Sequence, residues 1–260
     1  MRHNPRKRFG QNFLIDPQIV ADIVRAAHPR KDDLFVEIGP GLGALTRPLL
    51  QLLSHLHCVE IDRDIVEHLR REFSGKNLTI YSADALEFDF STLGKDLRVV
   101  GNLPYNISTP ILFHLSRFAS SICDMYFTLQ KEVVARMVAQ PSTSDYGRLS
   151  VMLQYRFEME QLFLISPECF RPAPKVESAV VRMIPRKQPL IDTSKEKLFA
   201  DIVSAAFSQR RKTLRNTLYD YLKLEDYTAL EIDSGKRAEN LSVAQFIAIT
   251  GHLSKRQLPS

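Results

Sequence analysis

A chain of 260 residues, 44% of them hydrophobic, can bury the core of one large domain or of one medium and one small domain. Its formal net charge of +5 favours a polyanionic partner. The 3 cysteines are widely spaced and lack a C-x-x-C pair, which argues against a disulfide framework and a zinc site. No apolar run approaches the ~18 residues of a membrane span, and polar residues follow the basic start where a signal peptide needs an apolar core. We therefore expect a cytoplasmic protein without a metal and without a membrane anchor.

Positive charge is unevenly distributed along the chain. Residues 186–260 carry 13 Lys and Arg against 9 Asp and Glu, whereas residues 1–185 carry 22 against 21. The remaining basic cluster is at the start of the chain, at Arg2, Arg6, Lys7 and Arg8. The C-terminal part is therefore the first candidate for a polyanion-binding surface, with a solvated basic face as the alternative.

The first predicted helix begins at Asp16 and Pro17, which suit the N-cap and the first helical position, and apolar residues recur at helical spacing behind them. The segment Gln-Asn-Phe-Leu at 11–14 precedes it as a loop that could close over a ligand. A short apolar run at 34–38 then leads into the glycine turn at 39–43 and an apolar-periodic helix. This order is typical of a strand, a tight turn and a helix.

Strands and helices continue to alternate, which predicts a parallel, doubly wound α/β sheet. The further predicted elements of this half are strands at 55–60, 78–81 and 97–100, a helix at 64–73, and a helix that begins at Thr109 and Pro110.

Polar or glycine residues stand at the carboxyl ends of four successive predicted strands. The glycine turn follows the first strand, and Glu60, Asp84 and Asn102 follow the others. Ligands of doubly wound sheets bind in the crevice outside these ends. We therefore expect these positions to form one site.

The second half of the chain contains a strand at 125–129, a helix at 131–139, an ambiguous segment at 152–165 whose second half favours a strand, a Pro-rich loop at 167–175 and a strand at 176–184. The segment 185–189 has the composition of a linker. Beyond it the pattern predicts helices at 195–207, 209–222 and 243–253. We expect one α/β domain over residues 1–185 and a small all-α domain over residues 190–260.

The glycine turn is compatible with two cofactors. The dinucleotide pattern G-x-G-x-x-G/A is matched by Gly39, Gly41 and Ala44. Glu60 follows the turn at close to the sequence spacing expected for a ribose-binding acid. In an S-adenosylmethionine site the glycines instead admit the methionine and ribose, Glu60 accepts the ribose hydroxyls and Asp84 accepts the adenine amino group. Asp84 and Asn102 favour the second cofactor, because hydride transfer has no special need of the segment that begins at Asn102.

That segment is Asn102-Leu103-Pro104-Tyr105, at the end of an apolar run. The side-chain oxygen of Asn102 and the next backbone carbonyl can accept both N–H bonds of a planar amine. Pro104 stiffens the backbone, and Tyr105 offers a flat face to a base taken out of its stack. The alternative is a strand followed by an ordinary Pro-containing turn.

Five motifs in order resemble those of the ribosomal RNA adenine N6-dimethyltransferase family over nearly the whole chain. They are Asn102-Leu103-Pro104-Tyr105, Glu37-x-Gly39-x-Gly41-x-Gly43, Gln11-Asn12-Phe13-Leu14, Phe170-x-Pro172-x-Pro174-Lys175-Val176-x-Ser178 and Ala206-Phe207-x-Gln209-Arg210-Arg211-Lys212-Thr213-Leu214. The resemblance is closer to the bacterial small-subunit enzymes than to others. It implies a Rossmann-like methyltransferase sheet that uses S-adenosyl-L-methionine as methyl donor.

The resemblance also implies roles for individual residues. The cofactor would be contacted by Asn12, Leu14, Gly39, Gly41, Glu60, Asp84 and Asn102. The target amine would be held by Asn102, Leu103, Pro104 and Tyr105, and Phe170 would stack on the other face of the base. Without its Pro-rich loop, Phe170 would be taken for a core aromatic.

The implied reaction is dimethylation of two adjacent adenosines in the hairpin loop near the 3′ end of 16S rRNA, in the small ribosomal subunit or its precursor, by a monomeric enzyme. Methylation of large-subunit rRNA is the alternative within the family. A nicotinamide-dependent dehydrogenase and a catalytically idle assembly factor are the alternatives outside that chemistry.

The predicted helix at 209–222 would place Phe207, Leu214 and Leu218 on one buried stripe. Arg210 on one side and Lys212 and Arg215 on the other would then flank it. We expect these cations to contact RNA phosphates, and a solvated basic face is again the alternative.

Overall fold

The computed structural model describes residues 12–256, so the basic residues at the start of the chain and Gln11 lie outside the described part. Two compact units divide the chain. The first contains the residues up to Val134 together with Met159–Pro185, and the second contains Ala135–Glu158 together with the chain from Arg186 onward. The boundary at 185 coincides with the expected linker, but residues 135–158 group with the C-terminal helices. They do so because Tyr146, Val151 and Tyr155 belong to the same apolar core as Phe199 and Phe246.

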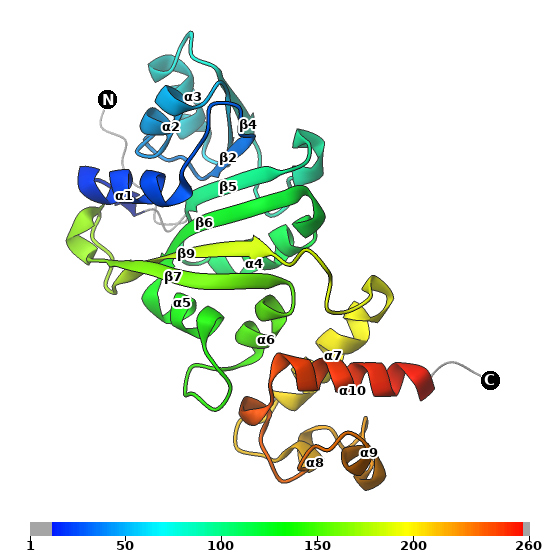
Figure 1. The fold of residues 1–260 in the computed structure, drawn as a ribbon. Coiled ribbons are helices and arrows are strands. Elements are labelled where there is room, and N and C mark those ends of the chain that lie inside the picture. The colour runs from blue at the N-terminus through cyan, green and yellow to red at the C-terminus, as the bar shows by residue number, and fades with distance from the viewer. Residues whose placement is uncertain (1–11, 257–260) are drawn as a thin grey trace. The chain divides into compact units, whose positions relative to one another are not determined.

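A seven-stranded sheet forms the centre of the first unit, in the order β4-β3-β2-β5-β6-β9-β7 (Figure 1). Strands β2 to β6 are parallel, as expected, whereas β9 runs antiparallel to β6. Strands β7 and β9 are joined without an α-helical crossover, so the chain reverses at this edge instead of continuing in parallel. The strands are β2 (Phe35–Ile38), β3 (Leu56–Glu60), β4 (Leu78–Ser82), β5 (Leu97–Asn102), β6 (Ile122–Gln130), β7 (Phe157–Ile165) and β9 (Ser178–Pro185).

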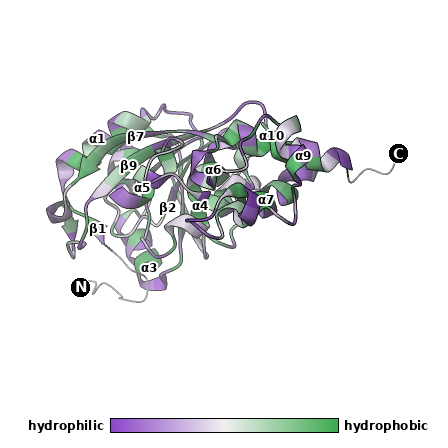
Figure 2. Cartoon of the chain, turned by 90° about the horizontal axis from the view of Figure 1, so that it is seen from below, coloured by the Kyte–Doolittle hydropathy of each residue, from purple (hydrophilic) through white to green (hydrophobic). Residues whose placement is uncertain are grey.

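Helices flank this sheet and carry both hydrophobic and hydrophilic residues (Figure 2). They are α1 (Pro17–Ala27), α2 (Thr46–Leu52), α3 (Arg63–Glu72) and α4 (Ser108–Ser116). The division between the two units falls within α5 (Lys131–Val138). Helix α1 begins as predicted, because the Asp16 carboxylate accepts the backbone N–H groups of Gln18 and Ile19 at 2.8 and 3.0 Å. The expected doubly wound α/β sheet is thus confirmed.

The core on one side of the sheet follows from alternation along the strands. Phe35, Leu56 and Val100 are buried in one cluster with Ile23 of α1 and Leu49 of α2. Successive strand residues point to opposite faces, so these positions recur on the same face of neighbouring strands. Strand order changes direction between β2 and β5, which places the carboxyl ends of these two strands at the switch point where ligands bind in such sheets.

A second, two-stranded sheet joins the N-terminal segment to the Pro-rich loop. Strand β1 (Phe13–Leu14) pairs antiparallel with β8 (Phe170–Arg171), with Leu14 opposite Phe170. The Ile15 backbone N–H extends the pairing to the Cys169 carbonyl at 2.9 Å. Sequence patterns predicted only loops here, since two-residue strands have no periodicity.

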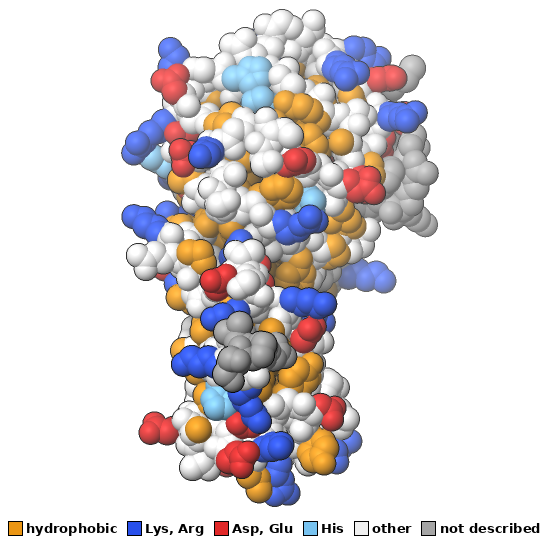
Figure 3. Space-filling model, turned by 90° about the vertical axis from the view of Figure 1, so that its right-hand side faces the viewer, with side chains coloured by type: hydrophobic (Ala, Val, Ile, Leu, Met, Phe, Trp, Pro, Cys, Tyr) orange, Lys and Arg blue, Asp and Glu red, His pale blue; other side chains and the backbone are white. Residues whose placement is uncertain are grey.

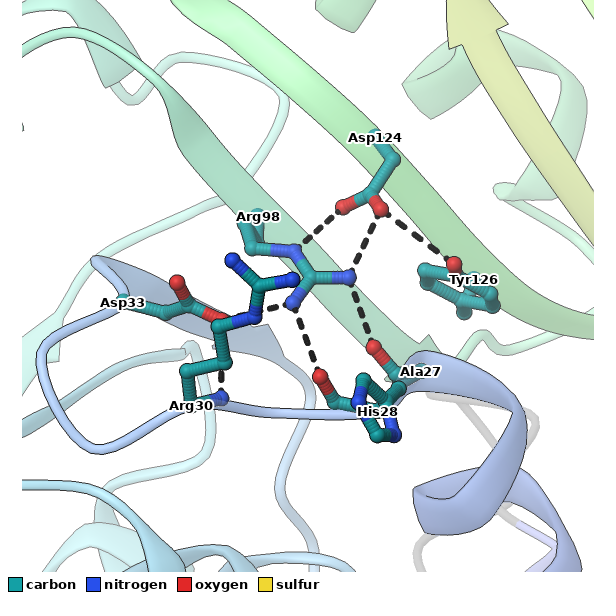
Figure 4. A network of polar contacts seen from close by, with 7 residues as sticks. All are labelled: Ala27, His28, Arg30, Asp33, Arg98, Asp124 and Tyr126. Carbon is teal, nitrogen blue, oxygen red and sulfur yellow. Dashed lines mark hydrogen bonds and ion pairs between the residues drawn. The ribbon is translucent and has the colours of Figure 1, made fainter.

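Arg98, at the start of β5, ties the end of α1 to the sheet (Figure 4). Its guanidinium donates to both Asp124 carboxylate oxygens at 2.8 and 2.7 Å and to Asp33 at 2.6 Å. It also donates to the carbonyl groups of Ala27 and His28 at 2.6 and 3.3 Å. A cation here satisfies carbonyl groups that the helix itself leaves without partners and suits the negative end of the helix dipole.

The second unit is helical. Its helices are α6 (Arg148–Gln154), α7 (Glu196–Ala206), α8 (Leu214–Thr217), α9 (Leu224–Ala229) and α10 (Val243–Arg256). Short 3-10 turns lie at Thr193–Lys195 and Ala238–Asn240 in this unit, and at Phe90–Leu93, Ala119–Ser121 and Pro167–Cys169 in the first unit.

The prediction of a continuous helix at 209–222 is wrong, since only α8 is α-helical there. Thr213 has extended backbone angles, and the backbone N–H groups of the next two residues donate to carbonyl groups outside the helix. Leu214 donates to the Lys236 carbonyl at 2.8 Å and Arg215 to the Ser234 carbonyl at 3.1 Å. Leu214 and Leu218 are nevertheless buried as expected, whereas Phe207 is only partly buried against their cluster.

Candidate active site

One cavity of about 220 Å³ lies at the carboxyl ends of the strands. Its walls come from the N-terminal segment, from the turn after β2, from the ends of β3 and β4, and from the segment after β5. Among the residues that line it are Asn12, Leu14, Gly39, Gly41, Glu60, Asp84, Asn102, Leu103, Pro104 and Tyr105. The structure thus brings together all but one of the residues that the sequence assigned to a site; Phe170 is the exception.

The glycine turn needs glycine for two separate reasons. Gly39 and Gly41 have φ of +66° and +54°, a region that side chains disfavour. A Cβ on Gly41 would also lie 2.9 Å from the Phe13 ring, so this position has no room for a side chain. The turn therefore brings bare backbone to the cavity wall, and a ligand can approach it closely.

Gly101 received no role from the sequence, but it governs the approach of β5 to β2. A Cβ there would lie 2.5 Å from the Ile38 carbonyl oxygen. Only glycine permits this contact, which fixes the position of Asn102 relative to the glycine turn. The signal in the sequence was a glycine inside an apolar strand, which often marks a close backbone approach.

Glu60 and Asp84 provide carboxylate acceptors in the cavity. Glu60 is 6% exposed, and burial raises its pKa above the ordinary value although backbone N–H groups of Asp62 and Gly41 lower it in part. Its Oε1 accepts the Asp62 N–H at 2.9 Å, and Asp84 Oδ1 accepts the Leu86 N–H at 2.9 Å. Each carboxylate has two oxygens with about four acceptor positions, so both side chains retain capacity for ligand donors.

Glu37 is a cavity residue that the sequence placed in a motif without giving it a role. It is 2% exposed, and its Oε2 accepts the Thr46 hydroxyl at 2.7 Å and the Cys58 thiol at 3.7 Å. Burial raises the pKa of Glu37 to about 7, against the lowering effect of these two bonds. A buried carboxyl of this kind favours a cationic ligand in the same cavity, because a nearby positive charge stabilises its ionised form.

The orientation of the Asn102 amide is fixed by the N-terminal segment. Its Nδ2 lies 2.8 Å from the Asn12 carbonyl oxygen. A carbonyl oxygen can only accept, so the amide nitrogen must face it, and Oδ1 is directed elsewhere as an acceptor. This hydrogen bond also joins the segment before α1 to the end of β5.

The rest of the Asn-Leu-Pro-Tyr segment is held by its neighbours. The Leu103 N–H donates to the Thr128 carbonyl at 3.2 Å. The carbonyl groups of Pro104 and Tyr105 accept the Ile107 N–H at 3.2 Å and the Ser108 hydroxyl at 3.0 Å. Two of the segment's carbonyl groups are thereby engaged, and that of Leu103 becomes the candidate second acceptor beside Asn102.

Phe170 does not line the cavity. Its side chain is 3% exposed and belongs to the cluster that contains Leu14, its partner in the β1–β8 pair. The structure therefore places Phe170 in the core, which is the alternative that the sequence allowed. The physical reason is the β1–β8 pairing, which draws the Pro-rich loop onto the N-terminal segment.

The donor set fits S-adenosylmethionine. The cavity offers a bare glycine backbone, two carboxylates for hydroxyl and amino groups, and a third, buried carboxyl for a cation. Among residues 12–256 no group of three or more His, Cys, Asp or Glu side chains is arranged to hold a metal ion. Within the same residues no helix is long and apolar enough to cross a membrane.

Comparison with known proteins identifies close relatives. The chain is 73% identical to a ribosomal RNA small subunit methyltransferase A of Nitrosospira multiformis over 98% of both chains. It is 64% identical to the protein of that name from Nitrosomonas europaea over 96% of both chains. Among solved structures, a dimethyladenosine transferase from Plasmodium falciparum matches 94% of this chain and 98% of its own with a TM-score of 0.83 at 25% identity. The 23S rRNA methyltransferase ErmE matches 94% of this chain and all of its own with a TM-score of 0.74 at 27% identity.

The family model for ribosomal RNA adenine dimethylase matches residues 2–255. The resemblance drawn from five motifs is thereby confirmed, together with the enzyme class and the methyl donor that it implied. The nicotinamide-dependent dehydrogenase that the glycine pattern allowed has no support among these relatives. The chain belongs to the ribosomal RNA adenine dimethylase family and is an S-adenosylmethionine-dependent rRNA methyltransferase.

Proposed function

We propose that this enzyme dimethylates N6 of two adjacent adenosines in the hairpin loop near the 3′ end of 16S rRNA, in the small ribosomal subunit or its precursor, and so contributes to subunit biogenesis. The relatives named ribosomal RNA small subunit methyltransferase A support the choice of subunit. The observation that carries the proposed chemistry is the Asn102 amide, oriented by the Asn12 carbonyl in the same cavity as Glu60 and Asp84.

We assign the cofactor contacts from the side chains around the cavity. Glu60 would accept the ribose hydroxyls and Asp84 the adenine amino group, while the backbone of Gly39 and Gly41 admits the methionine part. Asn12 and Leu14, on the segment joined to Asn102, would cover the ligand. When bound, the cofactor supplies an electrophilic methyl group on a sulfonium.

The target amine would be held by the segment after β5. Asn102 Oδ1 and the Leu103 carbonyl would accept its two N–H bonds, and Tyr105 would stack on the base at a gain of ~1–3 kcal/mol. These contacts fix the direction of the nitrogen lone pair, and alignment of this kind can lower a barrier by ~7–11 kcal/mol. The surplus amine proton passes to water after attack.

RNA docking would fall to the second unit. Backbone hydrogen bonds from Leu214 to Lys236 and from Arg215 to Ser234 bring two basic segments together. Lys212, Arg215 and Lys236 are exposed, and none has a salt bridge with a residue between 12 and 256. Arg210 differs, because it donates to the Ser144 carbonyl at 3.2 Å and lies 3.9 Å from Glu239. On the face of the molecule drawn in Figure 3, Lys and Arg side chains are interspersed with acidic ones. We therefore expect RNA phosphates to bind at a few cations without acidic partners, and not over a uniformly positive surface.

This docking surface can be tested with the triple substitution of Lys212, Arg215 and Lys236 to Gln. For every cation–phosphate pair that the substitutions remove, the plot of log affinity against log salt should flatten by roughly 0.7–0.9. Binding to small subunits should weaken while affinity for S-adenosylmethionine stays unchanged. Arg210→Gln is the matched control and should change the salt slope least. A triple variant with the wild-type salt slope would exclude this surface.

The proposed reaction is tested by incubating the protein with labelled S-adenosylmethionine and unmethylated small subunits or large subunits in parallel. Mass spectrometry of the nucleosides should find N6,N6-dimethyladenosine from the small subunits only. Product from large subunits would favour the alternative within the family. Absence of product from both would reject the proposed function.

A further inference from the structure

Ser178 is the last residue of the Pro-rich motif, and neither the cofactor nor the base contacts assigned above explain it. It begins β9 and is fully buried. Its Oγ lies 2.6 Å from the hydroxyl oxygen of Tyr105, in the cavity wall. The motif that begins at β8 and the Asn-Leu-Pro-Tyr segment after β5 are therefore connected by a short side-chain hydrogen bond.

The two partners of this bond differ in how firmly their backbones are held. Ser178 pairs with Gln130 in the β6–β9 ladder. The preceding residue, Glu177, accepts the Lys131 N–H at 3.0 Å through its carbonyl and binds the Lys131 ammonium at 2.7 Å through its carboxylate. Tyr105, in contrast, lies in the turn between β5 and α4. The firmly paired start of β9 thus holds the Tyr105 side chain through Ser178.

A bond at the far end of a tyrosine restricts the whole ring. The ring turns about two side-chain torsions, and anchoring its hydroxyl limits both. Burial raises the pKa of Tyr105, so its phenol stays protonated at neutral pH and the hydrogen bond persists. When a base binds to a ring that is already held in one orientation, less conformational entropy is lost than when the ring must be ordered on binding.

We propose that Ser178 is a positioning residue for methyl transfer, which holds the Tyr105 ring in the orientation that receives the flipped adenine. This inference rests on the proposed function, because it assumes that Tyr105 stacks on the target base. Ser178 acts through Tyr105 and contacts neither cofactor nor base.

The test is a double-mutant cycle with Ser178→Ala and Tyr105→Phe, in which each variant removes the same hydrogen bond and keeps the ring. Single-turnover transfer to unmethylated small subunits should fall about 2- to 10-fold in each, the range expected for one hydrogen bond. The double variant should be no slower than the slower single variant, and affinity for S-adenosylmethionine should be unchanged in all three. Ser150→Ala is the matched control, since it removes an equally buried hydroxyl from the second unit and should transfer at the wild-type rate.

Transfer at the wild-type rate in Ser178→Ala, or losses that multiply in the double variant, would overturn the inference and leave the proposed function standing. If Ser178→Ala does not fold, Tyr105→Phe removes the bond from the other side, and wild-type transfer in that variant contradicts the inference equally. A wild-type protein that transfers no methyl group would overturn the proposed function, and this inference with it.

Discussion

Substituting Asn102 by Ala should impair two steps to very different extents. The change removes Oδ1, which we assign to the target amine, and Nδ2, which donates to the Asn12 carbonyl at 2.8 Å. The first loss acts on the reacting group. The second loosens the segment before α1, whose residues Asn12 and Leu14 line the cofactor cavity.

The structure allows both losses to be given a magnitude. Removal of one preorganised polar group that stabilises a transition state lowers the rate by ~10²–10³-fold. Removal of an ordinary hydrogen bond costs ~0.5–1.5 kcal/mol, so the cofactor dissociation constant should rise only about 2- to 10-fold. Asn102→Ala should therefore be severely slow in transfer even when saturated with cofactor.

Single-turnover transfer at saturating cofactor measures the first effect, and calorimetric titration with S-adenosylmethionine measures the second. Asn77→Ala, which removes an exposed amide in the loop before β4, is the control and should behave as wild type in both assays. Transfer by Asn102→Ala within a few-fold of wild type would refute the amine-holding role. Unchanged cofactor affinity would show that the bond to Asn12 does not organise the cavity.

Three further outcomes are expected. Glu60→Ala and Asp84→Ala should each weaken S-adenosylmethionine binding by ~1–3 kcal/mol, and calorimetry that finds unchanged affinity in both would reject the cofactor assignment. Burial raises the pKa of Glu37 from 4.5 to about 7, so wild-type stability should fall relative to Glu37→Gln as the pH rises through this interval, by about 3 kcal/mol in total. Urea unfolding of the wild type and of Glu37→Gln at pH 4.5 and at pH 7 checks this. A difference in unfolding free energy between the two proteins that is the same at both pH values would contradict it. Arg98→Met leaves two carboxylates without their cation and should lower the unfolding free energy by ~3–5 kcal/mol, whereas a decrease under about 1 kcal/mol in the same assay would show that the network of Figure 4 is not stabilising.

The sequence predicted the parallel part of the fold and most of the candidate site because both depend on local patterns. Apolar runs located β2 to β6. The glycine turn after β2 and the polar residues after β3, β4 and β5 marked one edge of the sheet. Glu60, Asp84 and Asn102 line one cavity because parallel strands bring their carboxyl ends together.

The features that the sequence did not predict depend on long-range pairing. The reversal of β9, the β1–β8 pair and the backbone bonds that end the helical pattern before Leu214 join residues far apart in the chain. The burial of Phe170 has the same origin, since it follows from the pairing with Leu14, and its stacking on the target base stays a prediction. The raised pKa of Glu37 arises from burial in the folded chain, which spacing alone does not reveal.

The most direct test of the central claim is to locate the methyl groups in the RNA. Unmethylated small subunits are incubated with the protein and S-adenosylmethionine, and the 16S rRNA is digested into oligonucleotides for mass spectrometry. The account predicts four added methyl groups on one fragment of the hairpin loop near the 3′ end, two on each of two adjacent adenosines. Methyl groups on a single adenosine, on another base or elsewhere in the RNA would contradict it.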